Sequence, residues 1–284
     1  MIIWLASYPK SGNTWLRSML ATYFFSKDGL FDFELLNNID QYPGSNHFKK
    51  YDDLFLTPES TAKLWITEQK RINQDKKLRF FKTHNALCKI NNYSFTDSNN
   101  TLGAIHIVRD PRNIVTSLAH HYQIKKEEAF EFMKDEKKAL IEKKSNKFLG
   151  FVPLFSWIFH QKSWSECKKF PVLTIRYEDL QNETFQSFKK VFEFIKKITK
   201  MKKSLDREKA KKIIRSCEFD KLQKLEQEKG FKESMIIKES NKKLKFFNLG
   251  KKNDYNKLLD DKLIDEMNNF YQEQLQKYKY EKNY

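Results

Sequence analysis

Short apolar runs, each followed by polar residues that can open a helix, are the main pattern along this chain. Four of these runs are apolar or β-branched and have the length of a buried strand. They are Ile2–Ser7, Arg79–Lys82, Ala104–Val108 and Val172–Arg176. This alternation is typical of parallel strands in a doubly wound α/β protein. The sequence therefore predicts a central, mostly parallel sheet that is flanked by helices.

Apolar positions at helical spacing predict helices between and after these strands. The expected helices are Thr14–Phe25, Pro111–His121, Thr184–Ile195, Arg207–Ser216 and Asp260–Tyr278. The last of them has one apolar face, which we expect to pack against the core. That face is formed by Leu263, Met267, Phe270, Tyr271 and Leu275.

Residues 122–165 form a charged stretch of helical character followed by an aromatic one. We interpret them as an insertion over the functional site, within a single domain that spans residues 1–284. The aromatic side chains indicate either an apolar lid or ordinary buried packing. They are Phe151, Phe155, Trp157 and Phe159.

Composition narrows the class of protein. Hydrophobic residues make up 39% of the chain and include 25 Phe, which allows a sizeable core despite 32% charged residues. The longest apolar run, residues 148–159, is shorter than the roughly 18 residues that a membrane span needs. Because the first strand begins at Ile2, we also expect no signal peptide.

The net charge of +17 favours anionic ligands. One interpretation is a basic module that binds nucleic acid. That module would need a clustered basic face with interleaved aromatic residues, whereas these lysines are scattered among glutamates, as in residues 125–128. We therefore expect no nucleic-acid partner.

The three cysteines stand far apart and have no metal-ligand spacing. They are Cys88, Cys167 and Cys217. This usage is typical of reduced thiols in a cytoplasmic protein. The sequence shows no paired carboxylates at the loop that follows the first strand, so we expect no metal ion.

The first strand runs directly into a turn and a helix, a geometry that binds anions. Pro9 stiffens the entry, and Gly12 allows close approach of a ligand to the backbone. The amides of residues 11–15 should be open donors at a helix N-terminus, where the helix dipole adds positive potential. Lys10 adds a full charge. The spacing differs from Gly-x-x-x-x-Gly-Lys-Ser/Thr, so an ordinary nucleotide-triphosphate loop fits poorly.

A second strand, turn and helix place Arg109 at a strand end and Ser117 eight positions later. A guanidinium offers a planar fork that phosphate oxygens accept, and a hydroxyl adds a neutral donor. The alternative is that Arg109 only pairs with its neighbour Asp110.

Residues with charged or polar side chains also end or follow the other two strands, namely Lys82-Thr83-His84 and Tyr177-Glu178-Asp179. Ligands of such sheets gather beyond the carboxyl ends of the strands, so these segments should converge. His84 has the unperturbed pKa, about 6.5, that suits a general base near neutral pH. The other five histidines fit packing or loop positions better.

These segments together resemble the sulfotransferase family. Residues 8–15 match its Tyr-Pro-Lys-Ser-Gly-Thr-x-Trp loop, with Asn13 in place of the first Thr. Residues 82–84 look like its Lys-Thr-His segment, and residues 177–180 match Tyr-Glu-Asp-Leu. The spacing from Arg109 to Ser117 resembles its 3′-phosphate motif.

The resemblance is weakest at the C-terminal glycine loop of the family, Arg-Lys-Gly-x-x-Gly-Asp-Trp-Lys. Gly250 and Asp254 align with it, whereas the Arg and Lys are missing. We expect Lys251 or Lys252 to replace them as phosphate contacts. Phe219 lies in a segment that resembles the family's Thr-Ser-Phe only weakly.

The resemblance implies a P-loop-like three-layer α/β fold and transfer of a sulfuryl group from 3′-phosphoadenosine 5′-phosphosulfate to a small-molecule hydroxyl or amine. It implies His84 as general base, Lys10 on the leaving phosphate and Lys82 on the sulfuryl oxygens. The residues expected to bind this cosubstrate are Lys10, Ser11, Gly12, Asn13, Thr14, Trp15, Arg109, Ser117, Tyr177, Phe219, Gly250, Lys251 and Lys252.

Within that set, Trp15, Tyr177 and Phe219 are expected to hold the adenine, because purines stack on aromatic faces. Residues 28–75, 122–165 and 225–247 are expected to shape the acceptor pocket. The competing enzyme class is a metal-dependent nucleotide kinase. It would need a Lys inside the helix turn, whereas here the Lys precedes the Gly.

Overall fold

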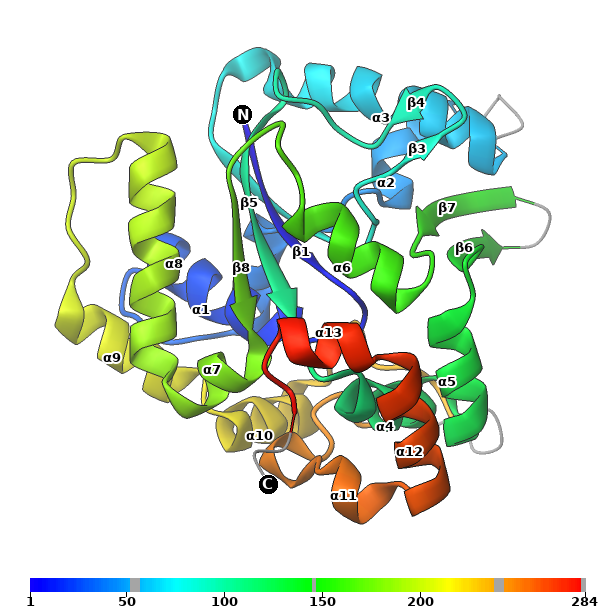
Figure 1. Ribbon diagram of the computed structural model, residues 1–284. Coiled ribbons are helices and arrows are strands. Elements are labelled where there is room, and N and C mark those ends of the chain that lie inside the picture. The colour runs from blue at the N-terminus through cyan, green and yellow to red at the C-terminus, as the bar shows by residue number, and fades with distance from the viewer. Residues whose placement is uncertain (52–56, 145–146, 238–242, 282–284) are drawn as a thin grey trace.

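Four parallel strands form the central sheet of the computed structural model, in the order β2-β1-β5-β8 (Figure 1). Their bounds are Ile2–Ser7 for β1, Arg79–Thr83 for β2, Thr101–Val108 for β5 and Val172–Arg176 for β8. The structure describes residues 1–51, 57–144, 147–237 and 243–281. The four strands predicted from the sequence, and their parallel arrangement, are confirmed.

β5 begins at Thr101 rather than at the predicted Ala104. The hydroxyl of Thr101 accepts a hydrogen bond from Nε1 of Trp4 at 2.8 Å, and Ile2 pairs with this residue across the sheet. Cross-strand pairing therefore extends the strand through Gly103, which interrupts the hydrophobic pattern in the sequence.

Helices cover the sheet and its carboxyl edge. The longer ones are α1 (Asn13–Phe25), α3 (Pro58–Ile72), α4 (Pro111–Tyr122), α5 (Lys126–Lys134), α6 (Trp157–Ser165), α8 (Thr184–Thr199), α9 (Arg207–Ser216), α10 (Phe219–Lys229) and α12 (Asp261–Phe270). The shorter ones are α2 (Ser45–Phe48), α7 (Tyr177–Asn182), α11 (Tyr255–Leu258) and α13 (Gln272–Lys277). The short 3-10 helices are η1 (Phe33–Asn38), η2 (Lys49–Tyr51), η3 (Asn73–Asp75) and η4 (Gly250–Lys252).

Alternate residues of β1 enter two different cores, which produces three layers. Ile3 and Leu5 pack with apolar residues of α1 and α8 on one face. Ile2 and Trp4 pack with residues of α3 and α6 on the other face. Because successive side chains of a strand point to opposite faces, a strand that is buried throughout needs a helical layer on each side. The expected three-layer α/β fold is confirmed.

A third core closes the carboxyl end of the sheet. It joins Tyr8 and Val108, which follow or end two central strands, to apolar residues of α4, α5, α12 and α13. Figure 1 shows these helices grouped at the end of the molecule toward which β5 points. This arrangement places α4 and the loop after β1 against a rigid support.

The predicted C-terminal helix is two helices, α12 and α13, with Tyr271 between them. Tyr271 is fully buried, and its ring lies 5.0 Å from that of Trp157 in α6. Packing of this one ring against the core coincides with the break in the helix. The apolar face that was expected to be buried includes Leu263, Met267 and Leu275, which are buried, whereas Phe270 is exposed.

Residues 122–165 are only partly helical. Between α5 and α6 lies an antiparallel pair of strands, β6 (Ala139–Lys144) and β7 (Lys147–Pro153). Phe151 of β7 stacks on Trp65 of α3, with the ring planes 2° apart. The expectation of a charged helical stretch followed by an aromatic one missed this hairpin, whose contact with Trp65 joins residues far apart in the sequence.

A second small antiparallel pair lies outside the main sheet, formed by β3 (Lys89–Ile90) and β4 (Tyr93–Ser94). Parts of the segments expected to shape the acceptor pocket, residues 52–56, 145–146 and 238–242, lie outside the described residues. Among the helices that the structure describes, none is long and apolar enough to cross a membrane.

Candidate active site

The loop between β1 and α1 has the backbone geometry of an anion site. Gly12 is the N-cap of α1 with a φ of 93°, and Lys10 has a φ of 65°. A Cβ atom at Gly12 would lie 2.4 Å from Cδ2 of Tyr177, so this position excludes every larger residue. The tight turn and the helix start that were predicted here are confirmed.

The open amides of this loop are fewer than predicted. The amide of Ser11 donates to the carbonyl of Tyr8 at 3.3 Å, and the amide of Trp15 donates to the preceding glycine carbonyl at 3.1 Å. The prediction that all the amides of residues 11–15 are open donors is therefore wrong for Ser11 and Trp15, because carbonyl groups of the same turn already accept their hydrogen bonds. Helix geometry leaves the amides of residues 13–14 without an intrahelical acceptor, so these amides can face an anion.

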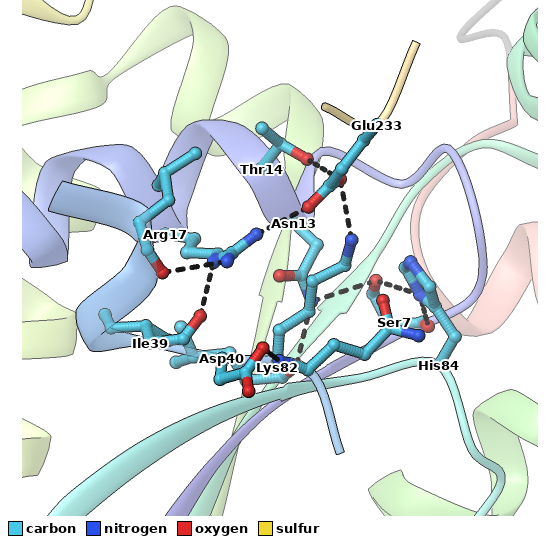
Figure 2. Close-up of polar contacts among 12 residues, drawn as sticks. Ser7, Asn13, Thr14, Arg17, Ile39, Asp40, Lys82, His84 and Glu233 are labelled. Atoms are coloured by element: carbon cyan, nitrogen blue, oxygen red, sulfur yellow. Dashed lines mark hydrogen bonds and ion pairs between the residues drawn. The ribbon is translucent and has the colours of Figure 1, made fainter. Parts of the chain in front are cut away.

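The side chain of Asn13 turns back toward the end of β1 and supports it. Its Nδ2 donates to the carbonyl of Leu5 at 2.8 Å and to Oγ of Ser7 at 3.2 Å. Ser7 in turn contacts Nδ1 of His84, through its carbonyl at 2.8 Å and its hydroxyl at 3.4 Å (Figure 2). Through its side chain Asn13 therefore links the loop to the expected base. Its backbone amide is the group that is left for an anion.

Hydrogen bonding selects one tautomer of His84. A carbonyl oxygen only accepts, so Nδ1 carries the proton and Nε2 carries the lone pair. Burial and the ammonium of Lys82 lower the pKa of His84 to about 3, well below the unperturbed value on which the sequence argument relied. The imidazole is therefore neutral at neutral pH and can accept a proton at Nε2.

Lys10 lies in an environment that disfavours its charge. Its Nζ is 3.9 Å from the ring centroid of Phe246. Burial and the neighbouring Lys82 and Arg109 lower the pKa of Lys10 to about 7. An anion bound beside these cations would favour the charged form of Lys10.

Lys82 is held by a carboxylate that the sequence did not indicate. Its Nζ lies 2.7 Å from Oε2 of Glu233, whose Oε1 lies 2.6 Å from the guanidinium of Arg17 (Figure 2). The hydroxyl of Thr14 also faces Oε2, at 3.4 Å. Burial lowers the pKa of Lys82, whereas the two cations hold the pKa of Glu233 at about 2. Lys82, Glu233 and Arg17 thus form one ionic cluster, in which both cations are buried.

The second strand end joins the first through Arg109. One guanidinium nitrogen donates to the carbonyl of Lys10 at 2.8 Å and to Oγ of Ser117 at 3.4 Å. Asp110 pairs instead with Arg112 at 2.7 Å. The alternative that Arg109 only pairs with Asp110 is therefore wrong, and Arg109 and Ser117 lie together as predicted.

Asn253 is the residue after η4 that meets this second site. Its Nδ2 donates to Oγ of Ser117 at 3.0 Å, and its Oδ1 accepts from Thr116. Lys251 and Lys252, the expected substitutes for the missing family charges, are exposed on η4. Their role in phosphate binding stays a prediction.

The expected adenine-binding rings lie along one side of the loop. The rings of Trp15 and Tyr177 are 6.0 Å apart, and Tyr177 also stacks under the guanidinium of Arg109 at 4.3 Å. Phe219 packs against Gly250, where a Cβ would approach its ring to 2.7 Å. The structure thus pairs two of the three rings and places the third against the glycine of η4.

Buried polar atoms at both strand ends lack a partner within the described chain. They include Oγ of Ser11 at the first loop and Nε of Arg109 at the second. Buried donors of this kind usually have an acceptor, and a ligand with an anion at each end would supply one. The donor set therefore fits a nucleotide with two separate phosphate groups. Among the described residues, no group of three His, Cys, Asp or Glu side chains could hold a metal ion.

Three residues of this region were missed by the sequence analysis, namely Arg17, Glu233 and Asn253. Arg17 lies one helical turn after Thr14, so helical spacing within α1 could have indicated it. No comparable signal exists for Glu233, which reaches the site from far along the chain.

Comparison with known proteins adds three findings. A family model described as the sulfotransferase domain matches residues 2–279. Sulfotransferase 1E1 from Bos taurus is 27% identical over 192 residues, which cover 67% of this chain and 57% of that protein. The matched part therefore spans less than two thirds of the length of this relative.

Two solved structures share the fold. A retinol dehydratase in complex with androsterone and the inactive cofactor PAP aligns with a TM-score of 0.62 at 16% identity, covering 96% of this chain and 80% of that one. A retinol dehydratase in a complex with retinol and PAP aligns with a TM-score of 0.61 at 15% identity, covering 96% and 81%.

Proposed function

The chain belongs to the sulfotransferase domain family, and from this premise we propose that it transfers a sulfuryl group from 3′-phosphoadenosine 5′-phosphosulfate to a hydroxyl of a small acceptor. The observation that carries the proposal is the bond from Arg109 to the Lys10 carbonyl, 2.8 Å long. It joins two anion sites at neighbouring strand ends. A donor with a 5′-phosphosulfate and a 3′-phosphate has the charges that these two sites need.

In this proposal the amides of residues 13–14, Thr14 and Lys10 hold the 5′ end of the donor, and Arg109 with Ser117 holds the 3′-phosphate. The donor supplies the sulfuryl group, whose bond to the phosphate oxygen breaks as the acceptor oxygen bonds to sulfur. Lys10 and Lys82 stabilise the negative charge that develops there. Positioning and electrostatics supply most of the catalysis in such transfers.

His84 takes the acceptor proton at Nε2. The carbonyl of Ser7 orients the ring through Nδ1 at 2.8 Å, so the lone pair has a fixed direction. A neutral imidazole is available throughout the neutral range because burial keeps its pKa low.

We propose that residues 122–165 form one wall of the acceptor pocket beside His84. Nε2 of His160 donates to the carbonyl of His84 at 3.1 Å, and Nε1 of Trp164 donates to the next carbonyl, that of Asn85, at 2.9 Å. Two solved relatives bind androsterone and retinol, which supports a small-molecule acceptor. The three free thiols support a cytoplasmic location.

Adenosine 3′,5′-bisphosphate should raise the melting temperature of the protein far more than ATP with magnesium does. ATP has no 3′-phosphate to pair with Arg109 and Ser117. At about 100 times its dissociation constant, the bisphosphate should add roughly 2.7 kcal/mol to the free energy of unfolding. Thermal melts with each nucleotide test this, and equal shifts would indicate a kinase-like triphosphate site instead.

Changing Arg109 to alanine should weaken binding of adenosine 3′,5′-bisphosphate by roughly 10- to 100-fold, because a charge-assisted hydrogen bond contributes about 1.5–3 kcal/mol. Adenosine 5′-phosphate, which lacks the 3′ group, should bind almost as before.

The double change Lys251→Ala with Lys252→Ala should also weaken adenosine 3′,5′-bisphosphate more than adenosine 5′-phosphate. The effect should be smaller than that of Arg109→Ala, since these lysines are exposed and hydrated. Calorimetric titration decides. Equal weakening of both nucleotides would assign Arg109 to the first loop only.

A further inference from the structure

A carboxylate of this chain lies beside Lys82 and Thr14, two residues that the proposed function assigns to the donor. Glu233 places one oxygen 2.7 Å from Nζ of Lys82 and 3.4 Å from the hydroxyl of Thr14, and its other oxygen 2.6 Å from Arg17 (Figure 2). We call Thr14, Arg17 and Lys82 the anion clamp. Each of these three side chains donates a hydrogen bond to the carboxylate.

The cations of the clamp are built into the fold. Lys82 is on β2, and its side chain is 5% exposed. Arg17 is 7% exposed, and it is fixed on α1 because its guanidinium also donates to the carbonyls of Ile39 at 2.7 Å and Leu36 at 2.9 Å. Two fixed, buried cations side by side need an anion, because burying an unpaired charge is costly.

The carboxylate, by contrast, comes from a connecting segment. Glu233 follows α10 and Gly230, lies outside every helix and strand, and is 27% exposed. Glu226 accepts from the hydroxyl of Ser234 and the amide of Phe246, so the residue that follows Glu233 is tied to α10. The anion is therefore the member of the cluster that can move without disturbing the sheet.

We propose that Glu233 is an internal competitor for the 5′ end of the donor, and that Arg17 is a further donor-binding residue which the donor gains when Glu233 leaves. The inference rests on the proposed function, because it uses the donor's position at Thr14 and Lys82. A phosphosulfate and a carboxylate cannot bind the same hydrogen-bond donors together. The phosphosulfate carries more charge and also reaches the amides of residues 13–14, so it displaces the carboxylate.

Protonation does not release the competitor. Arg17 and Lys82 hold the pKa of Glu233 at about 2, so the carboxylate stays ionised at neutral pH. Donor binding must therefore break this charge pairing directly. The apparent affinity for the donor is the intrinsic affinity multiplied by the fraction of molecules in which Glu233 does not occupy the anion clamp.

The test is calorimetric titration of wild type and Glu233→Gln with two probes, adenosine 3′,5′-bisphosphate and adenosine 3′-phosphate. We expect the variant to bind the bisphosphate at least tenfold more tightly than wild type does. Its affinity for adenosine 3′-phosphate, which has no 5′ anion, should be unchanged. Glu228→Gln is the matched control, since it removes the same charge from an exposed position on α10 and should change neither affinity.

Should the Gln variant not fold, Glu233→Asp provides the same test, because the shorter side chain keeps its charge but cannot span Arg17 and Lys82. It should show a smaller gain confined to the bisphosphate. Equal or weaker bisphosphate binding in a folded variant would overturn the proposal and make Glu233 a structural counter-ion. If folded wild type binds no bisphosphate, the proposed function itself fails, so the two failures are distinguishable.

Discussion

Replacing His84 by alanine should lower turnover by about 10²- to 10⁴-fold, the range that general-base catalysis contributes. The affinity for adenosine 3′,5′-bisphosphate should change little, because the proposed role of His84 is to take the acceptor's proton, and His84 is not among the residues expected to bind the donor. Its Nδ1 donates to the carbonyl of Ser7, so Nε2 is the nitrogen that can accept a proton, and the alanine variant lacks it. Turnover of an acceptor hydroxyl with labelled donor, together with titration of the bisphosphate, measures both quantities.

The matched control is His84→Asn, whose side-chain nitrogen takes the place of Nδ1 and can still donate to the carbonyl of Ser7 but cannot take up a proton. It should lose turnover to the same extent as the alanine variant while keeping the melting temperature of wild type. Normal turnover in either variant would remove His84 from the role of base. A loss confined to the alanine variant would mean that His84 only holds the strand end in place.

Lowering the pH from 7.5 to 5.5 should reduce the free energy of unfolding by about 3 kcal/mol through two core histidines, His106 and His160. Both are fully buried, and burial lowers the pKa of His106 to about 3 and that of His160 well below its usual value. In the unfolded chain each takes up a proton near pH 6.5, which the folded chain cannot do. Their contribution to stability is therefore present above pH 6.5 and is lost as the pH falls.

Urea unfolding at the two pH values measures this effect, and His106→Leu provides the control. Leucine cannot titrate, so the variant should lose about half of the two-histidine pH dependence, roughly 1.4 kcal/mol. Nδ1 of His106 lies 3.4 Å from the hydroxyl of Thr174, a contact long enough that its loss should cost little. An unchanged pH dependence in the variant would show that other groups cause the acid sensitivity.

Local sequence determined the sheet and the first half of the site. The four strands were readable because each is a short run of mainly apolar or β-branched residues, and β1 is buried along its whole length. The loop after β1 was readable because Gly12 adopts a φ of 93° and α1 begins at the next residue, and both depend only on adjacent positions. The pairing of Ser117 with Arg109 was readable as well, because Arg109 lies just before α4 and Ser117 lies within that helix.

Other features depended on contacts between distant parts of the chain, which no local pattern encodes. The β6–β7 hairpin packs through Phe151 on Trp65 of α3, and the C-terminal helix breaks at Tyr271, which packs on Trp157. Asn253, rather than either neighbouring lysine, meets Ser117 because η4 turns it inward.

The electrostatics of the site were decided by tertiary structure alone. Residue type indicated a histidine with a pKa near neutrality, but burial beside Lys82 lowers the pKa of His84 to about 3. The charge of Lys82 is balanced by Glu233, which is separated from it by 151 positions. A pKa and an ion pair depend on desolvation and on which charges meet in space, and these are set only once the chain has folded.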